Sequence, residues 1–216
     1  MTLIVGIDEA GRGPVIGPLV IAGVMINEKD EPKLIKLGVK DSKQLTEKRR
    51  NELFQEIKDL GVEYEILIIH PEEIDETLRS PSSNLNWLEA DKSVEIIKKL
   101  KPDGVILDCP STVPEKYKQY VEQKLKDKTN VIAEHKADDT YPVVSAASIL
   151  AKVTRDAEIE AIKKKYGDCG SGYPSDPKTQ DFLKKNFKKF PEIFRQTWES
   201  YKNIIRKKEQ KGLGDF

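Results

Sequence analysis

Two adjacent carboxylates and a glycine-rich turn follow the first apolar segment of the chain. Residues 3–7 are mostly aliphatic and predict a short buried strand, after which come Asp8 and Glu9. Carboxylates at the end of a buried strand are costly unless a cation neutralises them. The turn at 11–13 places glycines on both sides of an arginine, so a ligand can approach its backbone N–H groups closely. Acids that can hold a metal, beside amides and an arginine that can hold a phosphate, indicate phosphoryl-transfer chemistry.

A less specific interpretation of the same residues is a strand, a polar turn and a surface arginine. Neighbouring side chains of a strand point to opposite faces. Asp8 and Glu9 can therefore serve one site only if the strand ends at this point and the glycines bend the backbone.

Two further acids follow predicted strands. Asp108 ends an apolar segment that begins at residue 104, and Asp138 follows the predicted strand 130–133. Because the carboxyl ends of neighbouring strands in an α/β sheet open onto one crevice, we expect these acids to join the first pair. Two divalent cations about 4 Å apart would neutralise the four carboxylates and could align a water molecule and a leaving oxygen for in-line attack on phosphorus. A single Asp at a strand end can instead be a helix cap or a turn former.

The composition limits the kind of metal and the kind of protein. The two cysteines, Cys109 and Cys169, lie far apart, and the chain has only two histidines, which favours oxygen-ligated Mg²⁺ or Mn²⁺ over zinc. Lys plus Arg and Asp plus Glu both number 37, so there is no overall basic field. Basic residues concentrate in 163–211, which suits an anionic polymer but also a solvated helical face. The sequence has no apolar run near the roughly 20 residues of a membrane span and no signal-peptide pattern, so we expect a cytoplasmic protein. We also expect a monomer.

The elements that must position these residues alternate between strands and helices. The pattern predicts an α/β fold, a mixed sheet flanked by helices with a C-terminal helical extension. The predicted strands are 3–7, 19–26, 62–69, 104–108 and 130–133. The predicted helices are 46–60, one ending near 100, 114–126, 141–165, 177–187 and 191–206. We expect a catalytic domain over 1–165, a helical substrate-binding region over 166–208 and a polar tail over 209–216.

The motif Asp-Glu-Ala-Gly-Arg-Gly-Pro at residues 8–14 resembles the opening motif of ribonuclease HII, the type 2 ribonuclease H family. The resemblance runs in order from residue 5 to about residue 180 and is greatest to archaeal members. It continues at Asp-Ser-Lys (41–43), at Asp108, at Lys-Ala-Asp (136–138), at 141–156 and at 170–177.

The resemblance implies a ribonuclease H-like fold and an endonuclease that cuts the RNA strand of RNA–DNA hybrids. It also implies cutting 5′ of single ribonucleotides embedded in duplex DNA by two-metal catalysis, which leaves 3′-hydroxyl and 5′-phosphate ends. The implied metal-binding and catalytic acids are Asp8, Glu9, Asp108 and Asp138, the last in preference to its neighbour Asp139. The implied substrate contacts are the 2′-hydroxyl reader Gly11, Arg12 and Gly13, the junction-sensing Tyr173, and the phosphate contacts Ser42 and Lys43.

Some of these residues have plainer interpretations. Tyr173 could be a packing plug in a glycine-rich loop, and Lys43 a plain surface lysine. Three polar residues of the predicted helix 141–165 are assigned to helix packing and surface charge rather than to chemistry: Ser145, Ser148 and Lys152.

The end of the chain resembles the peptide that binds sliding clamps. Gln210, Leu213 and Phe216 stand at positions one, four and seven of that motif, although its usual second aromatic residue is missing. We therefore expect a sliding clamp as a partner, besides RNA–DNA hybrids and ribonucleotide-containing duplex DNA.

Three other functions compete with the one that the resemblance implies. Another ribonuclease H-like nuclease would share the acids but not the requirement for a 2′-hydroxyl. A non-catalytic hybrid-binding protein would bind without cutting, which the intact acid set disfavours. A nucleotide-dependent switch is disfavoured because the turn lacks the Lys-Ser/Thr of a P-loop.

Overall fold

The computed structural model describes residues 2–39, 45–125 and 129–212, and for 207–212 the backbone alone. The chain forms two compact units, the first made of Met1–Ala10, Val20–Ile68 and Leu85–Thr154, and the second of Gly11–Leu19, Ile69–Asn84 and Arg155–Phe216. Residues 11–19, 69–84 and 155–165 thus lie in the second unit, although the sequence pattern predicts a catalytic domain over 1–165. The functional boundaries at 165 and 208 stay a prediction.

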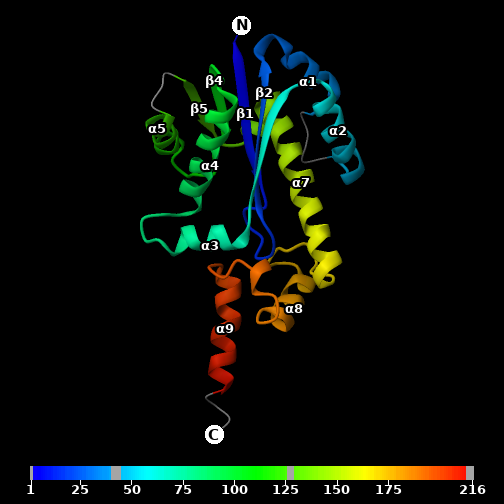
Figure 1. Ribbon diagram of the computed structural model, residues 1–216, viewed down its shortest axis with the longest axis vertical. Coiled ribbons are helices and arrows are strands. Elements are labelled where there is room, and N and C mark those ends of the chain that lie inside the picture. The colour runs from blue at the N-terminus through cyan, green and yellow to red at the C-terminus, as the bar shows by residue number, and fades with distance from the viewer. Residues whose placement is uncertain (1, 40–44, 126–128, 213–216) are drawn as a thin grey trace. The chain divides into compact units, whose positions relative to one another are not determined.

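The first unit is built on a mixed five-stranded sheet with the strand order β3-β2-β1-β4-β5 (Figure 1). Strand β1 pairs with β2 in an antiparallel manner and with β4 in a parallel manner, and β4 and β5 are parallel. The strands are β1 (Leu3–Ala10), β2 (Leu19–Asn27), β3 (Glu63–Ile69), β4 (Gly104–Asp108) and β5 (Asn130–Glu134). The expected α/β fold with a mixed sheet is confirmed.

Helices cover both faces of this sheet. Gly6 of β1 lies against the backbone of α7 at Val143 and Val144, whereas Gly23 of β2 lies against Ile96 of α4 together with odd-numbered β1 side chains. Successive strand residues face opposite sides, so α7 and α4 flank the sheet (Figure 1). The helical segments of this unit are η1 (Glu28–Asp30), α1 (Glu31–Leu37), α2 (Glu47–Asp59), α4 (Leu85–Leu100), α5 (Pro114–Leu125), α6 (Ala137–Thr140) and the first part of α7 (Pro142–Tyr166).

Strand β1 is longer than the sequence predicts. It continues through both carboxylates, with Asp8, Glu9 and Ala10 opposite Ala22, Ile21 and Val20 of β2. The prediction ended the strand where its side chains become polar. A ladder needs only backbone partners, and β2 supplies them along its whole length, so the strand does not stop at residue 7.

The second unit has its own apolar core, formed around Val15, Ile16, Phe182 and Phe194. It contains α3 (Pro71–Arg79), the end of α7, α8 (Pro177–Asn186), η2 (Pro191–Ile193) and α9 (Glu199–Gly212). The predicted single helix over 191–206 is wrong, because Phe194 leaves the helix to form a bridge with Ile16. Within the described ranges, no helix is both long and apolar enough to cross a membrane.

The packing of α7 on β1 predicts that Gly6→Ala destabilises the protein. A Cβ at this position would lie 2.5 Å from both the carbonyl carbon of Val143 and the backbone nitrogen of Val144, so strand and helix must separate. We expect a loss of roughly 1–3 kcal/mol in the free energy of unfolding, measured by urea denaturation. The matched control is Gly104→Ala on β4, whose Cβ would meet nothing closer than Ile4 at 3.6 Å. Equal stability of the two variants would contradict the close packing.

Candidate active site

Asp8 is one of the buried carboxylates of the first unit. Its side chain is only 5% exposed, and its Oδ1 accepts a hydrogen bond from the backbone N–H of Glu9 at 2.7 Å. Burial and the nearby carboxylates of Asp108 and Asp138 raise the pKa of Asp8 from its ordinary value to about 7, against the lowering effect of a hydrogen bond from the Ser148 hydroxyl. Three acids that are distant in the sequence therefore lie within electrostatic reach of one another.

The backbone explains how Asp108 and Asp138 reach this place. Ile7 and Leu107 are partners in the parallel ladder of β1 and β4, so Asp8 and Asp108 occupy the next position of adjacent strands. Oδ1 of Asp108 accepts a hydrogen bond from the N–H of Ala137 at 3.0 Å, at the start of the short helix α6. Asp138 is the next residue of α6 and is 4% exposed. A strand-end Asp thus also acts as a helix cap, as its less specific interpretation held.

Glu9 faces a different set of groups from Asp8. Because β1 stays extended through both residues, their side chains leave opposite faces of the sheet. Burial raises the pKa of Tyr117 well above its ordinary value, and the carboxylates of Glu89 and Glu9 contribute further. The backbone does not bend at Asp8 in the way that we required for one shared site. The assignment of Glu9 as a metal ligand stays a prediction.

The acids fit a divalent cation by the chemistry of their donor atoms. Carboxylate oxygens are the preferred ligands of Mg²⁺ and Mn²⁺. A bound cation would stabilise the charged form of Asp8 and so offset the effects of burial and of carboxylate repulsion that raise its pKa. Over the ranges that the structure describes, no three His, Cys, Asp or Glu side chains are arranged to hold a metal ion.

Helix α7 supplies polar groups close to the acids, although the sequence predicts for them only helix packing and surface charge. Ser148 is fully buried and donates its hydroxyl to Asp8, while Lys152, one turn later, donates to the Ser148 oxygen at 2.9 Å. Ser145 is also fully buried and donates to the backbone carbonyl of Asp138. The sequence signal that could have found the serines is their spacing of three residues on an otherwise apolar helix face.

The second unit holds the glycine-rich turn and the predicted junction-sensing tyrosine. A Cβ on Gly13 would lie 3.4 Å from the Tyr173 ring, so the ring lies next to the turn. Tyr173 is 40% exposed, which does not suit a packing plug. Arg155 packs against the ring of Tyr173. Its guanidinium carbon lies 5.3 Å from the ring centroid, and its Nη2 donates a hydrogen bond to the Ser171 carbonyl at 2.7 Å.

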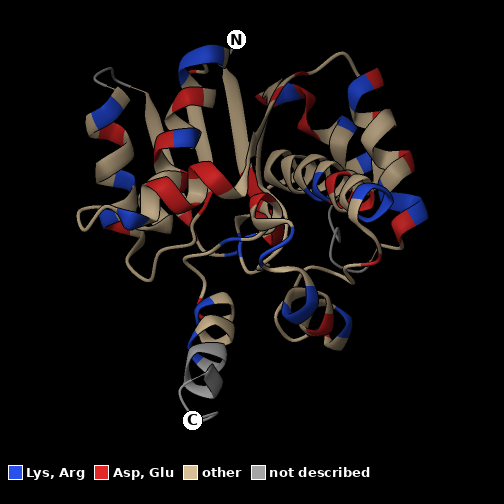
Figure 2. Ribbon diagram, turned by 60° about the horizontal axis from the view of Figure 1, so that its bottom comes forward, with Lys and Arg blue, Asp and Glu red and all other residues tan. Residues whose placement is uncertain are grey.

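The lysines of the C-terminal third are partly balanced by local acids. Helix α8 carries both lysines and an acid (Figure 2), and its single aspartate, Asp181, pairs with Lys185 at 2.6 Å. Lys178 pairs with Asp168 at 2.9 Å. These exposed pairs fit the solvated-face interpretation of some of the basic residues.

Several predicted contacts lie outside the described residues. These are the phosphate contacts Ser42 and Lys43 and the tail residues Leu213 and Phe216, together with the side chain of Gln210.

The raised pKa of Asp8 predicts an unusual pH dependence of stability in the metal-free protein. Between about pH 4 and pH 7 the folded state keeps a proton that the unfolded state has released, so the free energy of unfolding falls as the pH rises through this range. Asp8→Asn removes that loss and should stabilise the protein at pH 8 by on the order of 4 kcal/mol, at about 1.4 kcal/mol per pKa unit. Urea denaturation in EDTA at pH 5 and pH 8 measures it. The control Asp139→Asn changes an exposed acid beside the same cluster; a similar gain there would contradict the assignment to Asp8.

Comparison with known proteins agrees with the motifs. The family described as Ribonuclease HII matches residues 5–201. Ribonuclease HII of Pyrococcus furiosus is 50% identical, with 98% of this chain and 96% of that protein covered. Ribonuclease HII of Thermococcus onnurineus is also 50% identical, with coverages of 94% and 89%.

Solved structures give the same result for the fold. The crystal structure of ribonuclease H2 from Pyrococcus horikoshii matches with a TM-score of 0.87 and 46% identity, covering 95% of this chain and 98% of that one. The RNase HII in the structure of a PCNA:RNase HII complex from Archaeoglobus fulgidus matches with a TM-score of 0.84 and 45% identity, covering 91% and 95%. The chain therefore belongs to the ribonuclease HII family, a family of metal-dependent endonucleases of the ribonuclease H type that act on RNA–DNA hybrids.

Proposed function

We propose that this chain cuts the RNA strand of RNA–DNA hybrids and also cuts 5′ of a single ribonucleotide embedded in duplex DNA. The products carry 3′-hydroxyl and 5′-phosphate ends. The observation that carries the proposal is the convergence of Asp8, Asp108 and Asp138. Asp8 and Asp138 are almost fully buried, and the carboxylates of Asp108 and Asp138 help to raise the pKa of Asp8. Membership of the family supports the choice of substrate.

In the proposed mechanism the acids hold two divalent cations, Mg²⁺ or Mn²⁺. Asp8, Asp108 and Asp138 would supply ligands. Glu9 would join them only if the end of β1 bends on binding, because its side chain leaves the opposite face of the sheet from that of Asp8. The bound cations would supply the positive charge that activates the attacking water and stabilises the leaving 3′-oxygen. The protein's own groups orient the ligands: Ser148 donates to the Asp8 carboxylate, and the N–H of Ala137 fixes one oxygen of Asp108.

Recognition of the ribose is assigned to the second unit. The backbone at Gly11, Arg12 and Gly13 would bond the 2′-hydroxyl, the group that distinguishes RNA from DNA. The exposed ring of Tyr173, next to Gly13, would stack on the sugar that follows the ribonucleotide. Ser42 and Lys43 would contact phosphate. In this proposal residues 1–165 form the catalytic domain, which also carries the turn and the phosphate contacts, and residues 166–208 form a further substrate-binding region.

The first test is cleavage of a labelled DNA duplex that contains one ribonucleotide, beside an all-DNA duplex of the same sequence. Each is incubated with Mg²⁺, Mn²⁺ or EDTA. We expect a metal-dependent cut 5′ of the ribonucleotide and an intact control duplex. The variant Asp108→Asn should lose orders of magnitude in rate because it removes a charged ligand, while its unfolding curve stays cooperative.

Other outcomes select other functions. Cutting of both duplexes would support a ribonuclease H-like nuclease that does not read the 2′-hydroxyl. Binding without cutting under any metal would leave a hybrid-binding protein. Full activity of Asp108→Asn would overturn the assignment of the acids.

We also propose that the protein is a cytoplasmic monomer and that residues 210–216 bind a sliding clamp, which would bring the enzyme to DNA. One solved structure of a related RNase HII is a complex with PCNA, which supports a partner of this kind. Gln210, Leu213 and Phe216 are the residues that the motif assigns to the contact.

Removal of residues 210–216 should abolish clamp binding and leave the cleavage of short duplexes unchanged. Surface plasmon resonance with an immobilised archaeal PCNA measures the first effect, and the ribonucleotide cleavage assay measures the second. A control that replaces Lys211 and Gly212 by alanine keeps the three motif residues and should bind as the full chain does. Unchanged binding after the deletion would refute a role for the tail.

A further inference from the structure

Arg195 is a buried cation in the second unit whose hydrogen bonds go to backbone carbonyls of the glycine-rich segment. Its side chain has no exposed surface. Nη2 donates to the Gly11 carbonyl at 2.6 Å, Nη1 to the Arg12 carbonyl at 3.0 Å and Nε to the Gly17 carbonyl at 3.0 Å. A buried guanidinium is costly unless its N–H groups are satisfied, so these bonds hold the carbonyls in fixed directions.

The direction of the carbonyls determines the direction of the neighbouring amides. The carbonyl of Gly11 shares a planar trans peptide with the N–H of Arg12, and the carbonyl of Arg12 shares one with the N–H of Gly13. In a trans peptide the C=O and N–H bonds point in opposite directions. Since both carbonyls point at Arg195, the N–H groups of Arg12 and Gly13 point away from it.

Trp198 fixes the next carbonyl of the same turn. Its indole N–H donates to the carbonyl of Gly13 at 3.2 Å, and its ring centroid lies 4.8 Å from the guanidinium carbon of Arg195. The tryptophan therefore bonds the turn and stacks on the arginine that bonds it.

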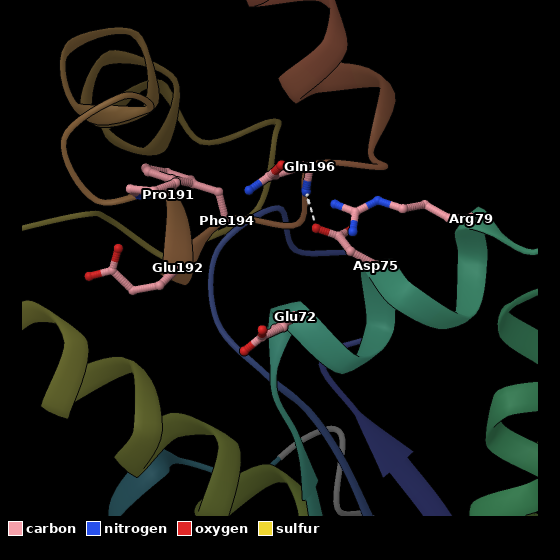
Figure 3. Close-up of a pocket in the computed structure, with 7 residues that line it drawn as sticks. All are labelled: Glu72, Asp75, Arg79, Pro191, Glu192, Phe194 and Gln196. Carbon is pink, nitrogen blue, oxygen red and sulfur yellow. Dashed lines mark hydrogen bonds between the residues drawn. The ribbon is translucent and has the colours of Figure 1, made fainter.

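The segment that carries both residues is itself held in place. Asp75, which is 2% exposed, accepts hydrogen bonds from the N–H of Gln196 at 2.7 Å (Figure 3) and from the N–H and hydroxyl of Thr197 at 3.0 and 2.5 Å. The N–H of Arg195 donates to the carbonyl of Val15 at 2.9 Å. The side chain of Arg195 thus extends from a backbone that is fixed on both sides.

We propose that Arg195 and Trp198 are positioning residues that aim the N–H groups of Arg12 and Gly13, and that they thereby set the selectivity for a 2′-hydroxyl. The proposal rests on the proposed function of the turn. Neither residue touches the substrate; each acts through the carbonyls that it bonds. A lysine could not replace Arg195, because a single ammonium lacks the planar fork that reaches three carbonyls at once.

The test measures selectivity rather than activity. Fluorescence anisotropy in EDTA gives the dissociation constants of the full chain for a duplex with one ribonucleotide and for the all-DNA duplex, and their ratio is the selectivity. Trp198→Phe keeps a ring over Arg195 but loses the bond to Gly13, and should lower the ratio about fivefold. Arg195→Lys should lower it roughly tenfold or more.

The matched control is Tyr201→Phe in α9, the helix that begins directly after Trp198. This variant removes a hydrogen bond to the Phe187 carbonyl at 3.3 Å. It should leave the ratio unchanged, because a general loss of folded protein reduces the apparent affinity for both duplexes alike. Thermal melts are to show whether Trp198→Phe is folded. With this variant the test does not depend on the stability of Arg195→Lys.

The outcomes separate this inference from the proposed function. If the unchanged protein binds the two duplexes equally, the reading of the 2′-hydroxyl fails and the inference fails with it. If the unchanged protein is selective and Trp198→Phe is equally selective, the inference alone is overturned.

Discussion

The close contact between strand β1 and helix α7 is the constraint on which the acid cluster depends. Gly6 has no side chain, so the helix backbone at Val143 and Val144 can lie directly on the strand. At this separation the serines of α7 reach the carboxyl end of β1, where Ser148 meets Asp8. A larger residue at position 6 would move the helix away and remove the Ser148 hydroxyl from the buried carboxyl group, which would keep the backbone N–H of Glu9 as a donor. The packing of a glycine thus determines the electrostatics two residues along the strand.

The two units hold charge in opposite ways. In the first, burial and the neighbouring carboxylates of Asp108 and Asp138 raise the pKa of Asp8. In the second, the buried guanidinium of Arg195 donates to three neutral backbone carbonyls. The first arrangement penalises the charged form of its carboxyl group, whereas the second satisfies donors of its cation within the protein.

Much of the fold and part of the site follow from local patterns in the sequence. Aliphatic runs and helical spacing predict the mixed sheet, and the rule that strand ends share a crevice brings Asp8, Asp108 and Asp138 together. The face of the sheet from which the Glu9 side chain leaves could not be predicted from such local patterns, because it depends on how far the pairing of β1 with β2 extends. The helix α3 was missed because it is short and mostly polar. Arg195 was missed for a different reason: it bonds a carbonyl 184 residues away, and no local pattern indicates a contact of that length.

The interleaving of the second unit has a consequence for the order in which the molecule is made. Its parts come from residues 11–19, 69–84 and 155–216, and Asp75 bonds backbone groups that follow it by 121 and 122 residues. During synthesis the strands and helices of the first unit leave the ribosome well before Arg195 and Trp198. Until these two residues emerge, the carbonyls of the glycine-rich turn have no guanidinium to bond. Contacts of such sequence separation form slowly, so the glycine-rich turn reaches its final arrangement late in the folding of the nascent chain.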